Sequence, residues 1–372
     1  MKEKKKIKLD PVLLAAWLLA VASAFFVKPG KEYIDYIDFR SLGILWGLMV
    51  VIQGLKENAV FEKIGQKLLG KVQKGWQLAL MLILLCFFGS MLITNDVALI
   101  TFVPFAMMIL HNCEREDLMI PVVVLQTVAA NMGSMLTPVG NPQNLYLYGL
   151  TGMPIGTFMG TMLPYTVAML ILLLLSVLLL PGKMQQVGKR SDFDAVRTFG
   201  STREIVIYTA LFVLALLTVL RLLDWRIMVG LVAVVVLLTD PKILFRADYI
   251  LLLTFIGFFI FTGNMGRMGT VRYALGKIVE GREFYVGILT SQFISNVPAT
   301  LLLSDFTRDF RELLLGVNVG GLGTLIASMA SLISYKAYGN AYPDSKGKYF
   351  LAFTGVNLLF LFILILLHWV IG

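Results

Sequence analysis

The sequence predicts an all-α polytopic membrane protein, and three observations lead to that fold class. Hydrophobic residues make up 58% of the 372 residues, charged residues only 15%, and the mean hydropathy is +0.81. A soluble domain usually has about 25% charged residues. Apolar stretches close to the ~20 residues needed to cross a membrane recur along the chain, without the alternation typical of barrel strands. We therefore expect about nine spanning helices, two re-entrant hairpins and two broken helices.

The spans can be placed in chain order from the apolar runs. The first, 11–27, follows a lysine-rich start, and its Ala22-Ser23-Ala24 resembles the cleavage site of a signal peptide. Because another apolar run follows at once, we interpret it as the first transmembrane helix. The other spans are expected at 39–55, 118–150, 160–180, 204–222, 226–240, 248–264, 313–335 and 349–371.

The apolar segment 77–110 is too long for one ordinary crossing. Thr94, Asn95 and Asp96 stand consecutively at its centre, and Asp96 is the only acid in the run. Two arms of about 15 residues, each about 22 Å long, would form a re-entrant hairpin with these polar residues at its tip. Both ends of the hairpin would then lie on one face of the membrane.

A second segment, 283–304, has the same plan, with a polar centre at Ser295-Asn296. If the N-terminus is inside and the spans alternate, the first hairpin dips from the inside and the second from the outside. Two halves of opposite orientation form an inverted repeat that meets at the midplane. The expected division is an N-terminal helix, a first repeat, a cytoplasmic linker with connecting helices, and an inverted second repeat: 1–38, 39–180, 181–247 and 248–372.

Basic residues support this orientation. The segments placed inside hold 21 Lys and Arg and those placed outside hold 11, in the direction expected because basic loops stay cytoplasmic. The net charge of +9 is therefore attributed to basic loops beside the membrane. Nucleic acid is not expected as a partner. We expect an inner-membrane location, with the N-terminus inside and the C-terminus outside. The bias is weakened by six basic residues placed outside: Arg267, Arg272, Lys277, Arg282, Arg308 and Arg311.

Each hairpin is followed by a span that small and polar residues interrupt. The first is ANMGSMLTPVGNPQNLYLY at 130–148, within 118–150, and the second is GVNVGGLGTLIASMASLISYKAY at 316–338, within 313–338. Glycine and proline break helices, and breaks at membrane depth are tolerated where backbone is buried or lines a wet cavity. Freed N–H groups suit an anion and freed carbonyls suit Na⁺. Close helix packing would explain each small residue taken alone. A hairpin followed by a broken span occurs twice, however, and this repetition favours a binding site.

These stretches resemble one known superfamily. Thr94-Asn95-Asp96, GSMLTPVGNPQN, SNVPAT and GVNVGGLGTLIAS together are similar to the ion transporter superfamily, which includes citrate transporters, arsenite permeases, sodium/proton antiporters and divalent-anion/sodium symporters. The resemblance covers about residues 39–371 and implies an inverted-repeat fold with an elevator-like motion. In the symporter branch a Ser-Asn-Thr motif at each tip meets substrate and sodium. Both Asn residues match here, both final Thr residues are missing, and the break motifs look more like the arsenite and sodium/proton branch.

The candidate substrate- and ion-binding residues lie at the two tips and the two breaks. An ionised carboxylate in the bilayer centre costs about 2.5–3.5 kcal/mol, so we expect Asp96 to bind a cation or carry a proton. The structural alternative is that Asp96 caps a helix starting at Val97. Asp96, Asn95 and Asn296 are the candidate Na⁺ ligands. The full set is Thr94, Asn95, Asp96, Thr137, Gly140, Asn141, Asn144, Ser295, Asn296, Asn318, Gly320 and Thr324.

Two functional classes remain open. One is an ion-coupled secondary transporter that moves a small anion, a carboxylate or an oxyanion, with Na⁺ or H⁺ as the coupling ion. The other is a Na⁺/H⁺ antiporter with Asp96 as the exchange site. An enzyme is disfavoured because metal-ligand clusters and nucleophile or phosphate motifs are absent, and Cys86 and Cys113 are expected to be unpaired. The expected partners are the anion, the lipid bilayer and a second copy in a homodimer, with no covalent cofactor.

Overall fold

The computed structural model describes residues 10–69, 72–187 and 200–371. The described residues form helices and one isolated bridge, between Lys74 and Gln186, which confirms the all-α prediction. The predicted basic start, Lys71 and the centre of the basic linker fall outside the described residues.

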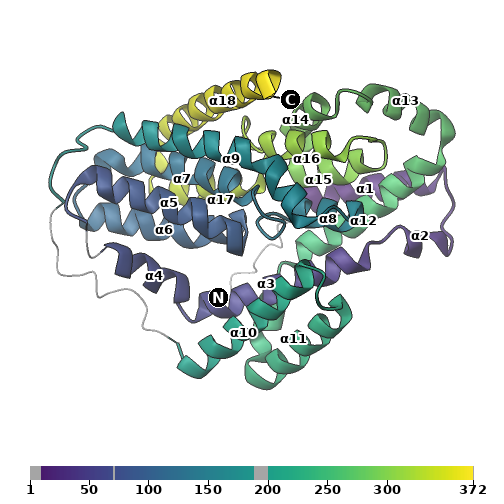
Figure 1. Cartoon of the computed structure of the whole chain (residues 1–372), viewed down its shortest axis with the longest axis horizontal. Helices are drawn as coiled ribbons and strands as arrows, with labels where there is room; N and C mark the ends of the chain where they lie inside the picture. Colours follow the sequence, from purple (N-terminus) through teal and green to yellow (C-terminus); the bar gives the residue numbers. More distant parts are fainter. Residues whose placement is uncertain (1–9, 70–71, 188–199, 372) are drawn as a thin grey trace, which may run out of the picture.

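The first half of the chain contains the first hairpin and the first broken helix (Figure 1). Its helices are α1 (Pro11–Ala24), α2 (Glu32–Asp35), α3 (Phe39–Glu57), α4 (Val60–Leu69), α5 (Gly75–Ile93), α6 (Asn95–Asn112), η1 (Glu116–Leu118), α7 (Met119–Ser134), α8 (Pro142–Thr151) and α9 (Ile155–Leu178).

The second half contains a connecting pair and then the same order of elements again. Its helices are α10 (Thr202–Val219), α11 (Trp225–Thr239), η3 (Pro241–Arg246), α12 (Tyr249–Arg267), α13 (Gly269–Val279), α14 (Glu283–Ile294), α15 (Asn296–Ser304), α16 (Phe310–Val319), α17 (Met329–Ala341), η4 (Pro343–Ser345) and α18 (Lys346–Ile371).

Eight helical segments within the described ranges are long and apolar enough to cross a membrane, so the chain is a multi-pass membrane protein. These eight include both arms of the first hairpin, α5 and α6. Three of the expected spans fall short of this length: α1 has 14 residues, α11 has 15, and 313–335 is divided between α16 and α17, with 10 and 13 residues.

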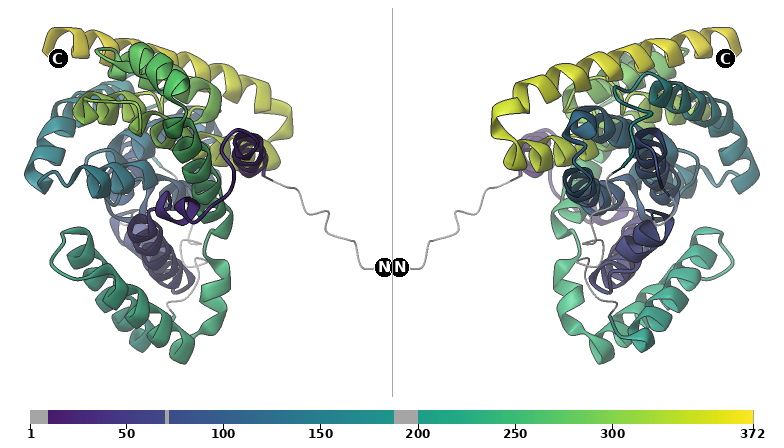
Figure 2. Two further views of the ribbon diagram at one scale, coloured as in Figure 1. Left: turned by 90° about the vertical axis from the view of Figure 1, so that its right-hand side faces the viewer. Right: turned by 90° about the vertical axis from the view of Figure 1, so that its left-hand side faces the viewer.

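The connecting helices and α18 lie on opposite edges of the molecule (Figures 1 and 2). On one edge α3 packs against α10 and α11, and nearby α1 packs against α12. Glycine makes these approaches close: a Cβ on Gly54 would meet the Tyr208 ring at 2.3 Å, and one on Gly257 would meet Ala16 at 3.1 Å. The two hairpins lie between the edges.

The first hairpin folds back on itself at Thr94, which has φ 69° and ψ 151°. The Gln126 amide, on α7, donates to the carbonyls of Leu82 (3.0 Å) and Phe102 (3.5 Å), one on each arm. The start of α5 at Gly75 lies against the buried Arg115 side chain just after α6, so both ends of the hairpin come together. With 19 and 18 residues, the arms are about 28 Å long, which is longer than the sequence predicts.

The second hairpin turns at Ser295, which has nearly the same backbone conformation, φ 74° and ψ 153°. Its ends are joined by an ion pair between Arg308 and Glu280 at 2.8 Å. Its arms are shorter, 12 and 9 residues. In Figure 1 the first hairpin lies to the left and the second to the right along the long axis.

The segments 56–76 and 265–282, which lie between the expected spans and the hairpins, are partly helical. The expectation that they are loops is wrong in this respect, because they contain α4 and α13. Both helices have only 10 or 11 residues and are amphipathic, so they carry neither the length nor the apolar composition of a span. Each stands directly before a hairpin.

We predict that the ends of the two hairpins face opposite sides of the membrane. In a variant without Cys86 and Cys113, single cysteines at Gln73 and Glu114 should react with an impermeant thiol reagent from one side. Cysteines at Lys277 and Arg308, which are also exposed, should react from the other. Reaction of positions 73 and 114 from opposite sides would contradict the re-entrant hairpin.

Candidate functional site

Each hairpin tip ends against the backbone just before a half-helix. The N–H of Asn95 donates to the carbonyl of Gly140 (3.1 Å), and the N–H of Asn296 donates to the carbonyl of Ala327 (2.9 Å). The next residues in the chain, Asn141 and Ser328, are the N-caps of α8 and α17. The two tips are therefore positioned by the same backbone contact in both repeats.

A threonine in each break makes a hydrogen bond to the first arm of the neighbouring hairpin. Thr137 Oγ1 donates to the carbonyl of Met91 (2.5 Å), and Thr324 Oγ1 donates to the carbonyl of Gln292 (3.1 Å). The sequence analysis identifies both threonines as site residues. The structure gives them a positioning contact with the hairpins.

Asn131 of α7 connects the first repeat to the second. Its Oδ1 accepts hydrogen bonds from Asn95 Nδ2 (3.1 Å) and Ser328 Oγ (3.0 Å), and its Nδ2 donates to Ser331 Oγ (3.3 Å). All four side chains are buried. A residue of the first broken helix thus binds the start of the half-helix α17 in the second.

Asn318 of α16 makes the reciprocal connection. Its Nδ2 donates to Asn144 Oδ1 (2.7 Å), and its Oδ1 accepts from Asn141 Nδ2 (3.4 Å). Asn141 and Asn144 belong to the first turn of α8 in the first repeat. The second broken helix therefore binds the half-helix of the first, and we call the two sets of contacts the crossed asparagine contacts.

The sequence analysis missed Asn131, Ser328 and Ser331 as site residues. A signal was present, because the partners in the two repeats are separated by a constant number of residues. The matched pairs are Asn131 with Asn318, Thr137 with Thr324, Gly140 with Ala327, Asn141 with Ser328, and Asn144 with Ser331. Aligning the two repeats on the predicted threonines would have revealed the others.

At both breaks, side-chain amides donate hydrogen bonds to some of the backbone carbonyls that have no partner within a helix. Asn144 Nδ2 donates to the carbonyls of Met135 and Thr137, both at 3.2 Å, at the end of α7. Gln292 Nε2 donates to the carbonyls of Gly320 (2.9 Å) and Leu322 (3.0 Å), at the end of α16. The predicted Gly320 site residue packs close to the hairpin, because a Cβ there would lie 2.8 Å from the Cα of Ile288.

Several buried polar atoms near the tips have no hydrogen-bond partner among the described residues. They are Oδ1 of Asp96, Oδ1 of Asn141 and both amide atoms of Gln143. A buried polar atom without a partner costs about 1–3 kcal/mol, so these atoms are candidates for contact with a ligand. Gln143, which is 1% exposed, was not among the predicted site residues.

The capping alternative for Asp96 is wrong in this structure. The helix α6 begins at Asn95, before Asp96, and its N-cap is Thr94. In the described part of the chain no helix N–H donates to the carboxylate, and the N–H of Asp96 itself donates to Asn95 Oδ1 (2.9 Å). The carboxylate is left available for a cation or a proton.

The site is polar but carries no basic side chain. The tips and breaks, taken as 91–97, 131–144, 292–297 and 318–331, contain no Lys, Arg or His. Each half-helix start contributes a partial positive charge of about +0.5 at most. Among the described residues there is also no group of three or more His, Cys, Asp and Glu side chains that could hold a metal ion. A cation here would be bound by amide, hydroxyl and carbonyl oxygens with the single carboxylate.

Two hairpins that meet two half-helix starts are typical of membrane transport proteins. The comparisons with known proteins give the family. The family model described as citrate transporter matches residues 3–308. The chain belongs to the citrate transporter family.

Similar curated proteins are also named as transporters or membrane proteins. An uncharacterized transporter of Methanocaldococcus jannaschii is 31% identical over 307 residues, which cover 82% of each chain. The inner membrane protein YbiR of Escherichia coli K12 is 31% identical over 329 residues, 86% of this chain and 85% of the relative. The silicon efflux transporter LSI3 of Oryza sativa subsp. japonica is 33% identical over 135 residues, 36% of this chain and 27% of the relative.

We predict that the contact between Asn318 and Asn144 couples the two repeats energetically. In a double-mutant cycle of alanine substitutions, the coupling should be about 0.6–1.7 kcal/mol, between the average and the maximum found for polar contacts between membrane helices. Unfolding in mixed micelles would measure it.

Asn264 offers a matched control. It is buried and donates to Ser23 Oγ (2.9 Å) and Tyr33 OH (2.8 Å), away from the tips. The cycle between Asn318→Ala and Asn264→Ala should be additive within about 0.5 kcal/mol. Equal coupling in both cycles would mean that the crossed asparagine contacts have no special role.

Proposed function

We propose that this protein is an ion-coupled secondary active transporter of the inner membrane that moves a small anion, a carboxylate or an oxyanion. The substrate binds where the two tips meet the starts of α8 and α17. The observation that carries the proposal is the pair of half-helix starts beside the two hairpin tips, in a site without a basic side chain. At the start of α8 the Gln143 amide, which can both donate and accept, has no partner among the described residues.

Charge balance supports coupling to a cation. A bound anion is attracted by the half-helix starts, but the nearby carboxylate of Asp96 repels it when ionised. A Na⁺ bound by Asp96, Asn95 and Asn296 oxygens, or a proton on Asp96, removes this repulsion. Substrate and cation then bind together more tightly than either does alone, which is the thermodynamic basis of symport.

The alternative is a Na⁺/H⁺ antiporter in which Asp96 alternately binds Na⁺ and H⁺. The observation in its favour is that Asp96 Oδ1 is buried and has no partner among the described residues. In this case no organic or oxyanion substrate exists.

The names of relatives guide the choice of test compounds. The family name points to citrate, and the rice relative is named for silicon efflux. The name of the Escherichia coli relative supports the inner-membrane location.

A thermal-melt experiment on the purified protein separates the two functions. Na⁺, Li⁺, citrate, succinate, arsenite, silicate, phosphate and sulfate would be tested singly and each anion with Na⁺. A ligand at 100 times its Kd should stabilise the protein by about 2.7 kcal/mol. We expect stabilisation by one anion that grows when Na⁺ or H⁺ is raised. Stabilisation by cations alone would favour the antiporter.

We predict that Asp96→Asn preserves folding and expression but abolishes gradient-driven transport in liposomes between pH 6 and 8. The amide keeps the shape of the side chain and loses both the charge and the exchangeable proton. Asp344→Asn is the matched control, because Asp344 is an exposed acid in η4. Normal transport by Asp96→Asn, with unchanged Na⁺ dependence, would show that Asp96 does not couple ions.

A further inference from the structure

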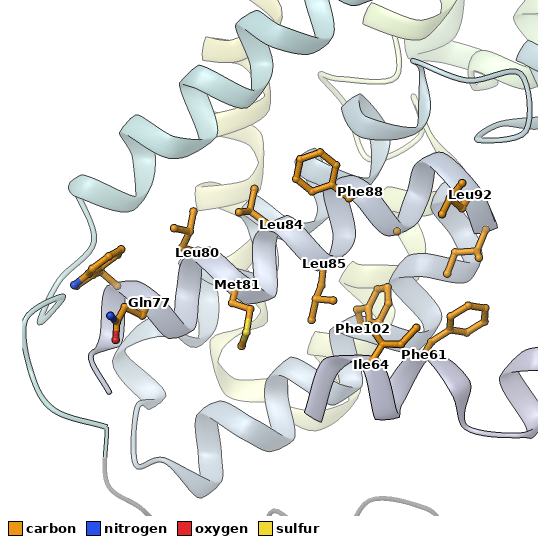
Figure 3. A pocket seen from close by; sticks show the side chains of 13 residues that line it. Phe61, Ile64, Gln77, Leu80, Met81, Leu84, Leu85, Phe88, Leu92 and Phe102 are labelled. Atoms are coloured by element: carbon orange, nitrogen blue, oxygen red, sulfur yellow. The ribbon is translucent and has the colours of Figure 1, made fainter. Parts of the chain in front are cut away.

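An apolar groove runs along α5, beside the amphipathic helix α4. Figure 3 shows Gln77 at one end of the groove and Leu92 at the other, with Phe61 and Ile64 of α4 and Phe102 of α6 on one side. The groove has a volume of about 560 Å³. Its one amide side chain, Gln77, is already engaged, because its Oε1 accepts from the backbone N–H groups of Gln73 (2.9 Å) and Lys74 (3.0 Å).

The groove is long. Gln77 and Leu92 are separated by about 22 Å along α5, calculated from the helical rise. An elongated apolar space of this kind suits a hydrocarbon chain, whose carbon atoms approach the apolar lining to about 3.5–4.0 Å.

A helix from a second copy of the chain does not fit this space. A helix about 10 Å across and 22 Å long would occupy roughly 1,700 Å³, more than the empty space of about 1190 Å³ in the groove, its open side included. It could insert only one row of side chains. The shape therefore favours a single flexible chain as the occupant.

The outer wall of the groove is apolar and open. Ile64, Phe88 and Leu92 are 49%, 50% and 51% exposed, in a protein whose apolar surface faces lipid. The two ends of the groove differ. One end reaches Ile93, next to the hairpin tip, and the other is lined by Trp76, a residue type that is enriched at the membrane interface.

Lys74 places positive charge at the Trp76 end, because it is the N-cap of α5, two residues before Trp76. A second lysine, Lys67, stands in the last turn of α4, which borders the groove. Both lysine side chains are exposed. The predicted topology places this end at the cytoplasmic surface, where basic residues attract anionic lipids.

We propose that this groove binds one acyl chain of an anionic phospholipid, whose headgroup lies beside Trp76 and Lys74, on the side of the groove that Lys67 borders. The chain fills the space between α4 and the first hairpin and extends to the level of the tip. Its headgroup phosphate is attracted by the two lysines, which selects this lipid over a zwitterionic one. The protein thus has a lipid partner at a defined position, independent of which substrate it transports.

Quenching of Trp76 fluorescence tests the proposal directly. A variant that keeps only Trp76, with Trp17, Trp46, Trp225 and Trp369 changed to Phe, would be reconstituted into phosphatidylcholine vesicles. Phosphatidylglycerol or phosphatidylcholine with brominated acyl chains would then be added in increasing mole fraction. Bromine quenches tryptophan only at short range, so the signal reports which lipid occupies the groove.

We expect the brominated phosphatidylglycerol to quench Trp76 with saturation, at a several-fold lower mole fraction than the brominated phosphatidylcholine. A variant that keeps only Trp369, which is 79% exposed near the C-terminus, should be quenched by both lipids in proportion to their mole fraction. The double substitution Lys67→Gln and Lys74→Gln should abolish the preference at Trp76. Lys242→Gln, at an exposed lysine of η3, should leave it unchanged.

Two results would overturn the proposal. Equal, unsaturated quenching of Trp76 by both lipids would show ordinary contact with bulk lipid. Absence of quenching by either lipid, with retained Trp369 quenching, would show that protein covers the groove, as in a dimer. Because the experiment needs no substrate, its failure would leave the proposed transport function untouched.

Discussion

The crossed asparagine contacts hold the two halves of the molecule in one arrangement. Asn131 of the first repeat binds Ser328 and Ser331 of the second, and Asn318 of the second binds Asn141 and Asn144 of the first. Each contact buries amide groups that would cost about 1–3 kcal/mol if left without a partner. Neither half-helix can therefore leave its position alone. The tips are bonded to the same segments through Gly140 and Ala327, so tips and breaks form one connected unit.

This unit is polar yet nearly uncharged, and that constrains its chemistry. Amides and hydroxyls can donate and accept, so they solvate an anion and a cation in the same space. They provide no fixed countercharge, in contrast to a site built on arginine or lysine. Asp96 is the single acid in the first hairpin and the half-helix starts carry partial positive charges. Net charge in such a site is balanced most simply by the ligands themselves, which is why we favour coupled binding.

Much of this arrangement could be predicted from the sequence, for a definite reason. Asn95, Asp96 and Asn296 stand out because polar residues are rare and costly in apolar runs, and Gly and Pro mark the breaks. Asn131 and Ser331 lie inside helices, where a small polar residue looks like a packing contact. Their partners are fixed only by how the two repeats cross in space. The helices α4 and α13 were not predicted, because short amphipathic segments resemble charged loops in sequence. The lengths of the hairpin arms also depend on tertiary packing, in particular on Gln126 between α5 and α6.

The two repeats carry different side chains at their tips, and the difference bears on which tip binds the coupling ion. Asp96 of the first tip corresponds to Val297 of the second, and Met91 corresponds to Gln292. Gln292 donates to two carbonyls at the end of α16, so part of that break is already bonded within the protein. In the first repeat Asn144 makes the equivalent bonds, to the carbonyls of Met135 and Thr137, so the repeats differ chiefly at the tip, where Asp96 Oδ1 lacks a partner among the described residues. A hard cation prefers the site that offers a carboxylate and uncommitted oxygens. The asymmetry therefore favours the first tip for the coupling ion and leaves the start of α17, with its hydroxyls Ser328 and Ser331, closer to the anion.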